Sequence, residues 1–400
     1  MSVPTIELSR VCHMDRQTTS AADAINAGRQ FVGMEHVDPG TGRILLGNGS
    51  RTGDGKGQAF LFDMRHVLFG KLRPYLRKIA LPQAQGCSST ELVPLLPDPK
   101  RLDRSYLFHW IRRYQVTDAL MARNTGARMP RADMSVLLGM SLPLPPLDEQ
   151  RRIVGLLDRA AEIRRRADAA RAKARTIIPA LFLDTFGDPA TNPKGWPVVT
   201  VGDLLESAAY GTSQKANDQG DGIPMIRMGN VTTGGQLDTI ALKHIDIAGQ
   251  EREKAELLEG DLLFNRTNSK ELVGKTGLWD GRFEAVAASY FIRLRVKRAL
   301  SNPSYLWAFF NTRYMKRALF DTARGAIGQA NINAKELRAF RVPAPPLDLQ
   351  AAFAEQVKRL ESLAHHLDAA ATKADAMAAA LSAEVFGQPQ PRVATASHAA

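Results

Sequence analysis

The chain contains the same helix start twice, at positions that differ by 200 residues. The stretch PLPPLDEQRRI spans Pro143–Ile153 and PAPPLDLQAAF spans Pro343–Phe353, and three prolines, a leucine, an aspartate and a glutamine of the first recur in the second. A stop signal has the same offset, with FGDP at Phe186–Pro189 and FGQP at Phe386–Pro389. Because start and stop share one offset, the two segments between them have equal lengths.

Each of these segments is predicted to be one long helix. Asp148 and Asp348 suit the N-cap, where a short carboxylate accepts a hydrogen bond from an unpaired backbone N–H. Gly187 and Gly387 suit the position after the last turn, and each has a proline two residues beyond it. Pro179 has no counterpart in the second segment and is expected to kink or loosen the first helix near its end.

Apolar residues recur along both segments at alternating steps of three and four. Of the eighteen positions reached from Ile153 and Phe353, seventeen are apolar and Gln356 is the exception. A sustained 3.5-residue repeat predicts coiled-coil packing, so we expect the two helices to pair. The positions are Ile153, Leu156, Ala160, Ile163, Ala167, Ala170, Ala174, Ile177 and Leu181, and Phe353, Gln356, Leu360, Leu363, Leu367, Ala370, Ala374, Met377 and Leu381.

An antiparallel pairing would place small residues opposite large ones, which fills space without voids. Ala170 could then face Leu360 and Ala167 could face Leu363, and a register one heptad step away is also possible. The simpler alternative is two separate amphipathic helices, each lying on its own domain. Equal lengths and shared caps favour pairing.

The predicted fold class is α+β, with two mixed α/β domains separated by a long antiparallel two-helix coiled coil. The expected boundaries are a first domain at 1–145, a helix at 146–187, a second domain at 188–345, a second helix at 346–387 and a disordered tail at 388–400. The two domains resemble each other weakly, for example in HVLFGK and DLLFNR. Domains at opposite ends of an antiparallel pair are related by a pseudo-two-fold axis.

The charge balance favours a polyanionic partner. The chain has 53 Lys and Arg against 41 Asp and Glu, a net charge of +12, and most of the excess lies in the two expected domains. Nucleic acid is therefore expected before a membrane. Cys12 and Cys87 alone cannot form a zinc site, and a reduced cytoplasmic chain is expected. We find no apolar region typical of a signal peptide and no apolar run long enough for a membrane span.

Catalytic motifs were sought and not found. The tripeptide Gly274–Thr276 is the end of a phosphate-binding loop, but Ser269 occupies the place of the first glycine of that motif. The TGDGKG stretch lacks the spacing of a dinucleotide loop. His365 and His366 are neighbours on a helix and point to different faces, so a metal-ligand pair is not expected. The sequence predicts no catalytic site and no metal site.

Polar, basic loops are the candidate functional segments. Arg and Lys neutralise phosphates, while Arg, Asn, Ser and Thr can also contact base edges. For any single residue, a solvated loop is the simpler explanation. The candidate DNA-binding residues are Arg51, Lys56, Lys71, Arg73, Arg77, Lys78, Arg123, Asn124 and Arg128 in the first domain, and Tyr210, Thr212, Ser213, Lys215, Arg227, Asn230, Arg266 and Asn268 in the second.

The stretches PLPPLDEQ, LFGKLRPYLRK, GCSSTEL, NPKGWP, YGTSQKA and RMGNVTTGGQLD resemble those of the specificity subunits of type I restriction-modification systems. The resemblance covers nearly the whole chain. One departure is Leu349, which stands where Glu149 stands in the first helix start. The resemblance implies two target-recognition domains that each bind half of a split target in double-stranded DNA, without a catalytic site.

The resemblance also implies partners and a cellular role in phage defence. Two methyltransferase subunits would bring S-adenosylmethionine and methylate adenine at N6, and motor-nuclease subunits would use ATP and Mg. This chain itself is expected to bind no cofactor. One rival is a specificity subunit from another modification system, such as a type II enzyme with separate subunits. A second rival is a structural coiled-coil scaffold that does not bind DNA.

Overall fold

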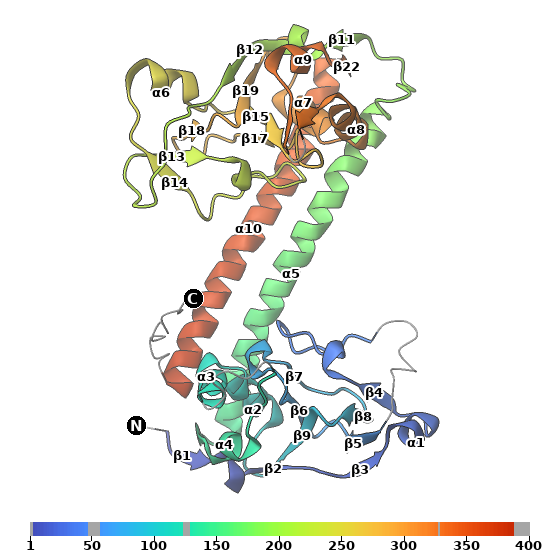
Figure 1. Cartoon of the computed structure of the whole chain (residues 1–400), viewed down its shortest axis with the longest axis vertical. Coiled ribbons are helices and arrows are strands. Elements are labelled where there is room, and N and C mark those ends of the chain that lie inside the picture. Colours follow the sequence, from blue (N-terminus) through green and yellow to red (C-terminus); the bar gives the residue numbers. More distant parts are fainter. Residues whose placement is uncertain (1–2, 47–56, 123–128, 327–328, 388–400) are drawn as a thin grey trace. The chain divides into compact units, whose positions relative to one another are not determined.

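The computed structural model describes residues 3–46, 57–122, 129–326 and 329–387. The chain divides into two compact units. The first unit comprises residues 1–165 and 370–400, and the second comprises residues 166–369. Each unit contains one α/β domain and one half of each long helix, as Figure 1 shows. Among the described residues, no helix is long and apolar enough to cross a membrane.

The first domain is built from two four-stranded sheets, ordered β2-β9-β6-β7 and β3-β5-β8-β4, and a short ladder of β1 with β10. Its strands contain continuous apolar runs such as VLFG, which is typical of strands buried on both faces. The strands are β1 (Thr5–Glu7), β2 (Cys12–Met14), β3 (Thr18–Ser20), β4 (Gln30–Val32), β5 (Gln58–Phe62), β6 (Val67–Gly70), β7 (Ile79–Ala80), β8 (Gly86–Ser89), β9 (Leu92–Pro97) and β10 (Ser141–Pro143). The short helices are α1 (Ala21–Asn26), α2 (Arg104–Ile111), α3 (Tyr114–Met121) and α4 (Met134–Gly139), with 3-10 turns η1 (Leu8–Arg10), η2 (Met34–His36) and η4 (Pro74–Leu76).

The second domain has a four-stranded sheet of the same plan, ordered β12-β19-β15-β17. A three-stranded sheet β14-β13-β18, a ribbon β16-β21-β20 and a ladder of β11 with β22 complete it. The strands are β11 (Val198–Thr200), β12 (Leu205–Tyr210), β13 (Ile223–Ile226), β14 (Lys243–Ile245), β15 (Leu262–Asn265), β16 (Thr267–Asn268), β17 (Thr276–Leu278), β18 (Val286–Ala287), β19 (Phe291–Val296), β20 (Arg324–Ala326), β21 (Gln329–Asn331) and β22 (Arg341–Pro343). The helices are α6 (Gly249–Ala255), α7 (Pro303–Phe310), α8 (Arg313–Thr322) and α9 (Ala334–Ala339), with 3-10 turns η5 (Val201–Leu204) and η6 (Met228–Asn230).

The two domains share a common plan in their sheets. In each, an antiparallel sheet is joined to a second sheet that contains one parallel pair, β4 with β8 in the first domain and β13 with β18 in the second. The mixed α/β content expected for both domains is therefore present. The weak sequence likeness between HVLFGK and DLLFNR falls on β6 and β15, which occupy the same place in their sheets.

The two long helices are α5 (Leu147–Phe186) and α10 (Leu347–Phe386), which agree with the repeated start and stop signals. The prediction that Asp148 and Asp348 are N-caps is wrong. The helices already begin at the preceding leucines, so both aspartates lie inside the first turn. There a carboxylate still interacts favourably with the positive end of the helix dipole. The predicted ends are confirmed, since Gly187 and Gly387 have positive φ of 83° and 91°.

The repeated glutamine explains why the helix start is duplicated. Gln150 and Gln350 are fully buried. The Gln150 side chain accepts the backbone N–H of Asp103 and donates to the carbonyls of Arg101 and Pro145. Gln350 likewise accepts the N–H of Asn302 and donates to Pro345. Each glutamine thus ties its long helix to the start of a domain helix, α2 or α7.

A repeated tyrosine makes a second tie at the same place. The hydroxyls of Tyr106 and Tyr305 donate to the carbonyls of Pro143 and Pro343 at 3.0 and 2.5 Å. These tyrosines belong to the repeated SYL tripeptides and are fully buried. Burial raises the pKa of both hydroxyls, so they remain protonated donors. The distant SYL and PxPPLDxQ motifs are therefore two sides of one junction.

Within each unit the halves of α5 and α10 run antiparallel. In the first unit, Arg164 pairs with Asp375 at 2.9 Å, and Ile153 shares a core cluster with Phe386. In the second unit, the rings of Phe186 and Phe353 lie 5.2 Å apart. Arg171 pairs there with Asp368 at 2.5 Å. In an antiparallel helix pair, the numbers of two facing residues have a constant sum, which defines the register. This sum is 539 in each of these pairs, whereas it is 530 for the facing pairs that the sequence predicts. The predicted register, with Ala170 opposite Leu360 and Ala167 opposite Leu363, is therefore wrong.

The predicted apolar seam is wrong at most of its alternate positions. Leu156, Ile163 and Ile177 are exposed on α5, and Leu363 and Met377 are 58% and 72% exposed on α10. The buried face instead follows steps of four and then three. Its members are Ile153, Leu157, Ala160, Ala167 and Ile178 on α5, and Phe353, Val357, Ala371 and Ala374 on α10.

The C-termini of the long helices are capped by different side chains. In the first unit the Arg113 guanidinium donates to the carbonyls of Phe386 and Gly387 at 2.6 and 2.7 Å. In the second unit Lys194 donates to two carbonyls in the last turn of α5, and the Trp196 indole donates to Phe186. These side chains satisfy carbonyls that have no partner within the helix. The NPKGWP stretch is therefore a helix-capping segment.

Candidate nucleic-acid interface

The loop after β6 carries four of the basic candidate residues of the first domain, Lys71, Arg73, Arg77 and Lys78. Lys71 and Arg73 are fixed through their backbones, because the N–H of Lys71 donates to Glu91 and the N–H of Arg73 donates to Pro130. The Lys71 carbonyl accepts the N–H of Ala132. The structure thus joins the segments KLRPYLRK and MPRA, which are distant in sequence. Arg51, Lys56, Arg123, Asn124 and Arg128 lie outside the described residues.

Two candidates of this loop use their cationic groups inside the domain. The Lys78 ammonium donates to the Met34 carbonyl at 2.7 Å. The Arg77 guanidinium lies 4.0 Å from the centroid of the Tyr114 ring and donates to the Arg112 carbonyl. Lys78 and Arg77 therefore hold the domain together, which leaves Lys71 and the exposed Arg73 as the candidates with free side chains among the described residues of this loop.

The second domain has a corresponding loop after β15. Arg266 follows the last residue of β15; its N–H donates to the Tyr290 carbonyl and its carbonyl accepts the N–H of Ile332. Asn268 lies on β16, which pairs with β21. The Arg266 guanidinium lies 4.9 Å from the centroid of the Tyr210 ring. The Asn268 amide is 3.9 Å from the Met228 sulfur, so this loop also touches the turn that contains Arg227.

Two other candidates in the second domain are buried. Thr212 is 5% exposed and its hydroxyl donates to Glu251, while Asn230 is 7% exposed. The Asn230 amide accepts the N–H of Arg227 and donates to the carbonyls of Asp238 and Ala241. A side chain enclosed in this way shapes its loop and cannot reach a ligand at the surface. Ser213 and Lys215 are exposed, and Arg227 is half-buried.

Sequence reasoning missed a lysine that positions the Arg227 turn. Lys275 donates to the carbonyls of Met228 and Val231 at 3.0 and 2.7 Å. It stands in the GKT tripeptide, Gly274–Thr276. Lys78 makes the same contact with Met34 in the first domain. The likeness of VGM and IRM, each followed by a lysine donor later in the domain, could have indicated this shared clamp.

Lys316 of α8 contacts the backbone next to Lys275. Its ammonium donates to the Gly274 carbonyl at 2.7 Å. Burial, together with repulsion from Lys275, lowers the pKa of Lys316 to about 7. Burial also lowers the pKa of Lys275. The two lysines therefore fix backbone carbonyls, and they are not available as phosphate contacts.

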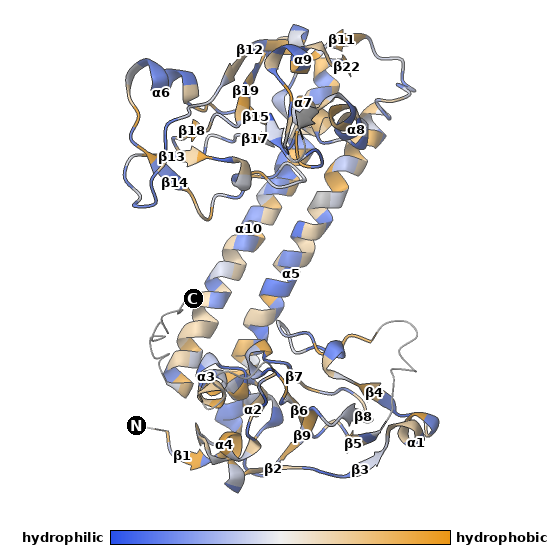
Figure 2. Cartoon of the chain, viewed as in Figure 1, coloured by the Kyte–Doolittle hydropathy of each residue, from blue (hydrophilic) through white to orange (hydrophobic). Residues whose placement is uncertain are grey.

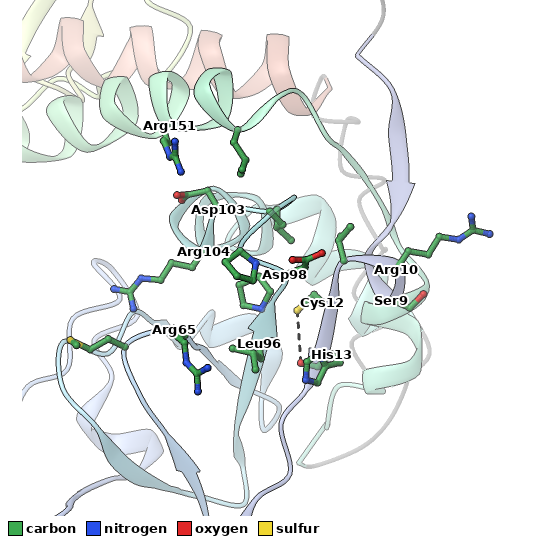
Figure 3. A pocket seen from close by; sticks show the side chains of 16 residues that line it. Ser9, Arg10, Cys12, His13, Arg65, Leu96, Asp98, Asp103, Arg104 and Arg151 are labelled. Carbon is green, nitrogen blue, oxygen red and sulfur yellow. Dashed lines mark hydrogen bonds between the residues drawn. The ribbon is translucent and has the colours of Figure 1, made fainter.

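A cleft of about 620 Å³ lies in the first unit between β2, the start of α2 and the start of α5. Figure 3 shows Arg104 and Arg65 on one side of it, while the Arg10 side chain points away. Arg65 is paired with Asp63, and Arg104 donates to the Pro82 carbonyl. Because these two cations already have partners, neither of them defines a ligand for the cleft. Within the described ranges, no group of three or more His, Cys, Asp or Glu could hold a metal ion.

Comparisons with known proteins agree on one family. Residues 193–372 match the family model described as the type I restriction modification DNA specificity domain. The chain is 28% identical over 173 residues to the putative type I restriction enzyme MjaX specificity subunit of Methanocaldococcus jannaschii, covering 43% of this chain and 40% of that protein. It is 26% identical over 301 residues to the EcoKI specificity subunit of Escherichia coli K12, covering 70% of this chain and 63% of that protein. The chain thus spans less than two thirds of the length of either relative.

A solved structure of the type I restriction-modification S subunit from M. genitalium has a similar fold. The TM-score is 0.63 at 11% identity, with 98% of this chain and 97% of that chain covered. At this identity the likeness is one of fold. The sequence matches carry the comparison: residues 193–372 match a type I restriction modification DNA specificity domain, and the chain is similar to type I specificity subunits.

Proposed function

We propose that the chain is a sequence-specific DNA-binding subunit that binds a bipartite target in double-stranded DNA, one half-site per domain. The observation that carries the proposal is the correspondence between the domains. Each has a polar, basic loop at the same strand end, after β6 or β15, and each holds that loop in place with backbone hydrogen bonds. Loops fixed at strand ends can enter a DNA groove without disturbing a core.

The free cationic and polar side chains divide into two roles in this proposal. Lys71, Arg73 and Lys215 are exposed or half-buried and contact phosphates, which gives affinity for any sequence. Arg227, Arg266 and Asn268 lie on touching loops and contact base edges. Ser213 is a further base or phosphate contact. The buried Thr212 and Asn230 and the engaged Arg77 and Lys78 are left out of the contact set.

In the proposal, α5 and α10 form one antiparallel coiled-coil spacer that sets the distance between the half-sites and relates the domains by a pseudo-two-fold axis. Two observations support this spacer: the helices have equal lengths, and the numbers of facing residues on α5 and α10 add up to 539 in both units. A paired helix is stiff, whereas a flexible linker would not fix a distance. Half-sites about 34 Å apart present the same groove to two symmetric readers.

The proposed partners are two methyltransferase subunits and the motor-nuclease subunits, with a cytoplasmic location. Catalysis belongs to these partners, which bring S-adenosylmethionine, ATP and Mg, and this chain contributes no catalytic group. Exposed apolar side chains on the long helices support a docking role. Ile163 and Met377 are exposed in the first unit, and Ile177 and Leu363 in the second. Figure 2 shows hydrophobic and hydrophilic stretches alternating along α5 and α10.

The test is to co-express the chain with its methyltransferase partner and sequence the methylated positions in the host DNA. A split motif with two specified halves is expected. Inserting four residues near Ala170 should change the gap between the halves and leave their bases unchanged. A change of bases at constant gap would refute the spacer, and absence of any methylated motif would refute the function. The subunits that co-purify with the chain identify the modification system to which it belongs. Salt-dependent binding to duplex DNA would exclude the alternative of a coiled-coil scaffold that does not bind DNA.

A further inference from the structure

We propose that Tyr210 is a positioning residue that holds the Arg266 guanidinium for contact with a guanine, and so determines specificity at one base pair. This inference rests on the proposed function. Tyr210 is the last residue of β12, and its side chain is 46% exposed. The Arg266 guanidinium lies over its ring at 4.9 Å. A ring face attracts a guanidinium, and a stacked guanidinium keeps one orientation.

Both residues of the stack are held from behind. The Arg266 backbone is bonded on one side to Tyr290 and on the other to Ile332. The Tyr210 hydroxyl accepts the N–H of Ala334, the first residue of α9, at 3.3 Å. The ring is therefore fixed at both ends, by β12 and by α9. A side chain whose flexible end is fixed before binding loses less entropy when it binds.

The Arg266 guanidinium has donors to spare in this position. Its Nε is buried and has no hydrogen-bond partner among the described residues, and no ion pair with a carboxylate is found there for Arg266. Arg293 and Arg295 of the same domain are different, since both pair with Asp261. Since the buried Nε of Arg266 cannot reach a ligand, the terminal amino groups of its guanidinium are the ones that can donate to O6 and N7 of guanine.

The first domain does not repeat this arrangement. Its guanidinium–tyrosine stack is Arg77 on Tyr114, and there the guanidinium donates to the Arg112 carbonyl and the Tyr114 hydroxyl. The Arg77 guanidinium thus donates hydrogen bonds within the fold, whereas for that of Arg266 the described residues show only the contact with the Tyr210 ring. The Arg77–Tyr114 stack is the matched control for the Arg266–Tyr210 stack.

The experiment uses the full chain with its methyltransferase partner and a pool of randomised duplex DNA, and sequences the bound fraction. For the wild type, at least one guanine in one half-site should be strongly specified. Arg266→Ala should reduce the preference at that position by about 5- to 150-fold. Tyr210→Leu should reduce it at the same position by about two- to five-fold, the value of an exposed cation–ring contact. Tyr210→Phe keeps the ring and should keep most of the preference, and Tyr114→Leu should leave that half-site unchanged.

The outcomes separate the inference from the function on which it rests. If the wild type selects no motif, the proposed function fails and the inference fails with it. If the wild type selects a split motif but Tyr210→Leu leaves the position relaxed by Arg266→Ala fully specified, only the inference is refuted. It is also refuted if Tyr210→Leu weakens all positions equally, because that result indicates a merely structural role. Thermal unfolding of each variant identifies any loss of fold.

Discussion

Replacement of Gln150 by leucine tests the junction between helix and domain that the duplicated motif builds. The side chain is fully buried and makes three hydrogen bonds of 2.8–2.9 Å, one from the N–H of Asp103 and two to the carbonyls of Arg101 and Pro145. Leucine is similar in size but offers no polar atom. The variant therefore removes the bonds and leaves one N–H and two carbonyls unpaired in the interior.

The expected loss follows from these three bonds. Each hydrogen bond contributes about 0.5–1.5 kcal/mol net, and a buried group left unpaired costs about 1–3 kcal/mol. The more apolar leucine offsets part of this cost by its burial, about 1 kcal/mol. We therefore expect Gln150→Leu to destabilise the first unit by roughly 2–4 kcal/mol.

Hydrogen exchange followed by mass spectrometry measures this loss locally. Peptides that cover the loop at Asp103 and helix α2 should exchange faster in the variant, and peptides of the second domain should not change. Gln350→Leu is the matched variant, because it makes the equivalent contacts with Asn302 and Pro345. It should produce the reverse pattern. A loss below about 0.5 kcal/mol, the usual range for surface substitutions, would refute the reasoning.

Three further substitutions, together with Leu363→Asp as a control, test the helix packing, the cap of α10 and the titration of Lys316. Val357→Asp should destabilise the second unit by about 3–5 kcal/mol in urea unfolding, because Val357 is 1% exposed, whereas the exposed Leu363→Asp should cost little. Arg113→Met should lose about 1–3 kcal/mol and speed amide exchange at the end of α10, since two carbonyls lose their donor. The pKa of Lys316 is lowered to about 7, so between pH 7 and its ordinary value near 10.5 the unfolded chain binds more protons than the folded one. Stability should therefore rise with pH across that window, by up to about 1.4 kcal/mol per pH unit, and in Lys316→Met this rise should disappear.

Local signals predicted the long helices well, while the seam between them could not be predicted from periodicity. Prolines before the start and glycines with positive φ after the end act within a few residues, so the helix ends follow directly from the sequence. The seam is ambiguous because α5 has adjacent apolar pairs at Leu156–Leu157 and Ile177–Ile178. Steps of three and four, or of four and three, then both meet apolar residues at these places.

Ion pairs between the helices accompany the observed seam, and the periodicity of apolar residues does not take such pairs into account. The observed seam includes the positions of Arg164 and Arg171. These residues are not apolar, so a search for apolar repeats excludes this seam. Both guanidinium groups are about half-exposed at the edge of the pair and reach carboxylates on the other helix, Asp375 and Asp368. A long arginine side chain can cover apolar surface while its charge stays near water. An apparently polar seam position is therefore tolerated where the partner helix supplies an acid.

Long cationic side chains can also be used inside a domain, and for this reason the net charge reveals little about which residues form the candidate interface. Lys78, Arg77 and Lys275 stand in loops that sequence reasoning selects as basic and polar, yet all three donate to backbone carbonyls within their own domain. A cation in a loop can satisfy carbonyls that have no strand or helix partner, and the sequence does not distinguish this use from phosphate binding. Under the proposed function these contacts would still serve recognition. They fix the turns beside Met34 and Met228 and so limit the freedom of the loops before DNA binds, and the cations without a partner in the domain would then make the DNA contacts.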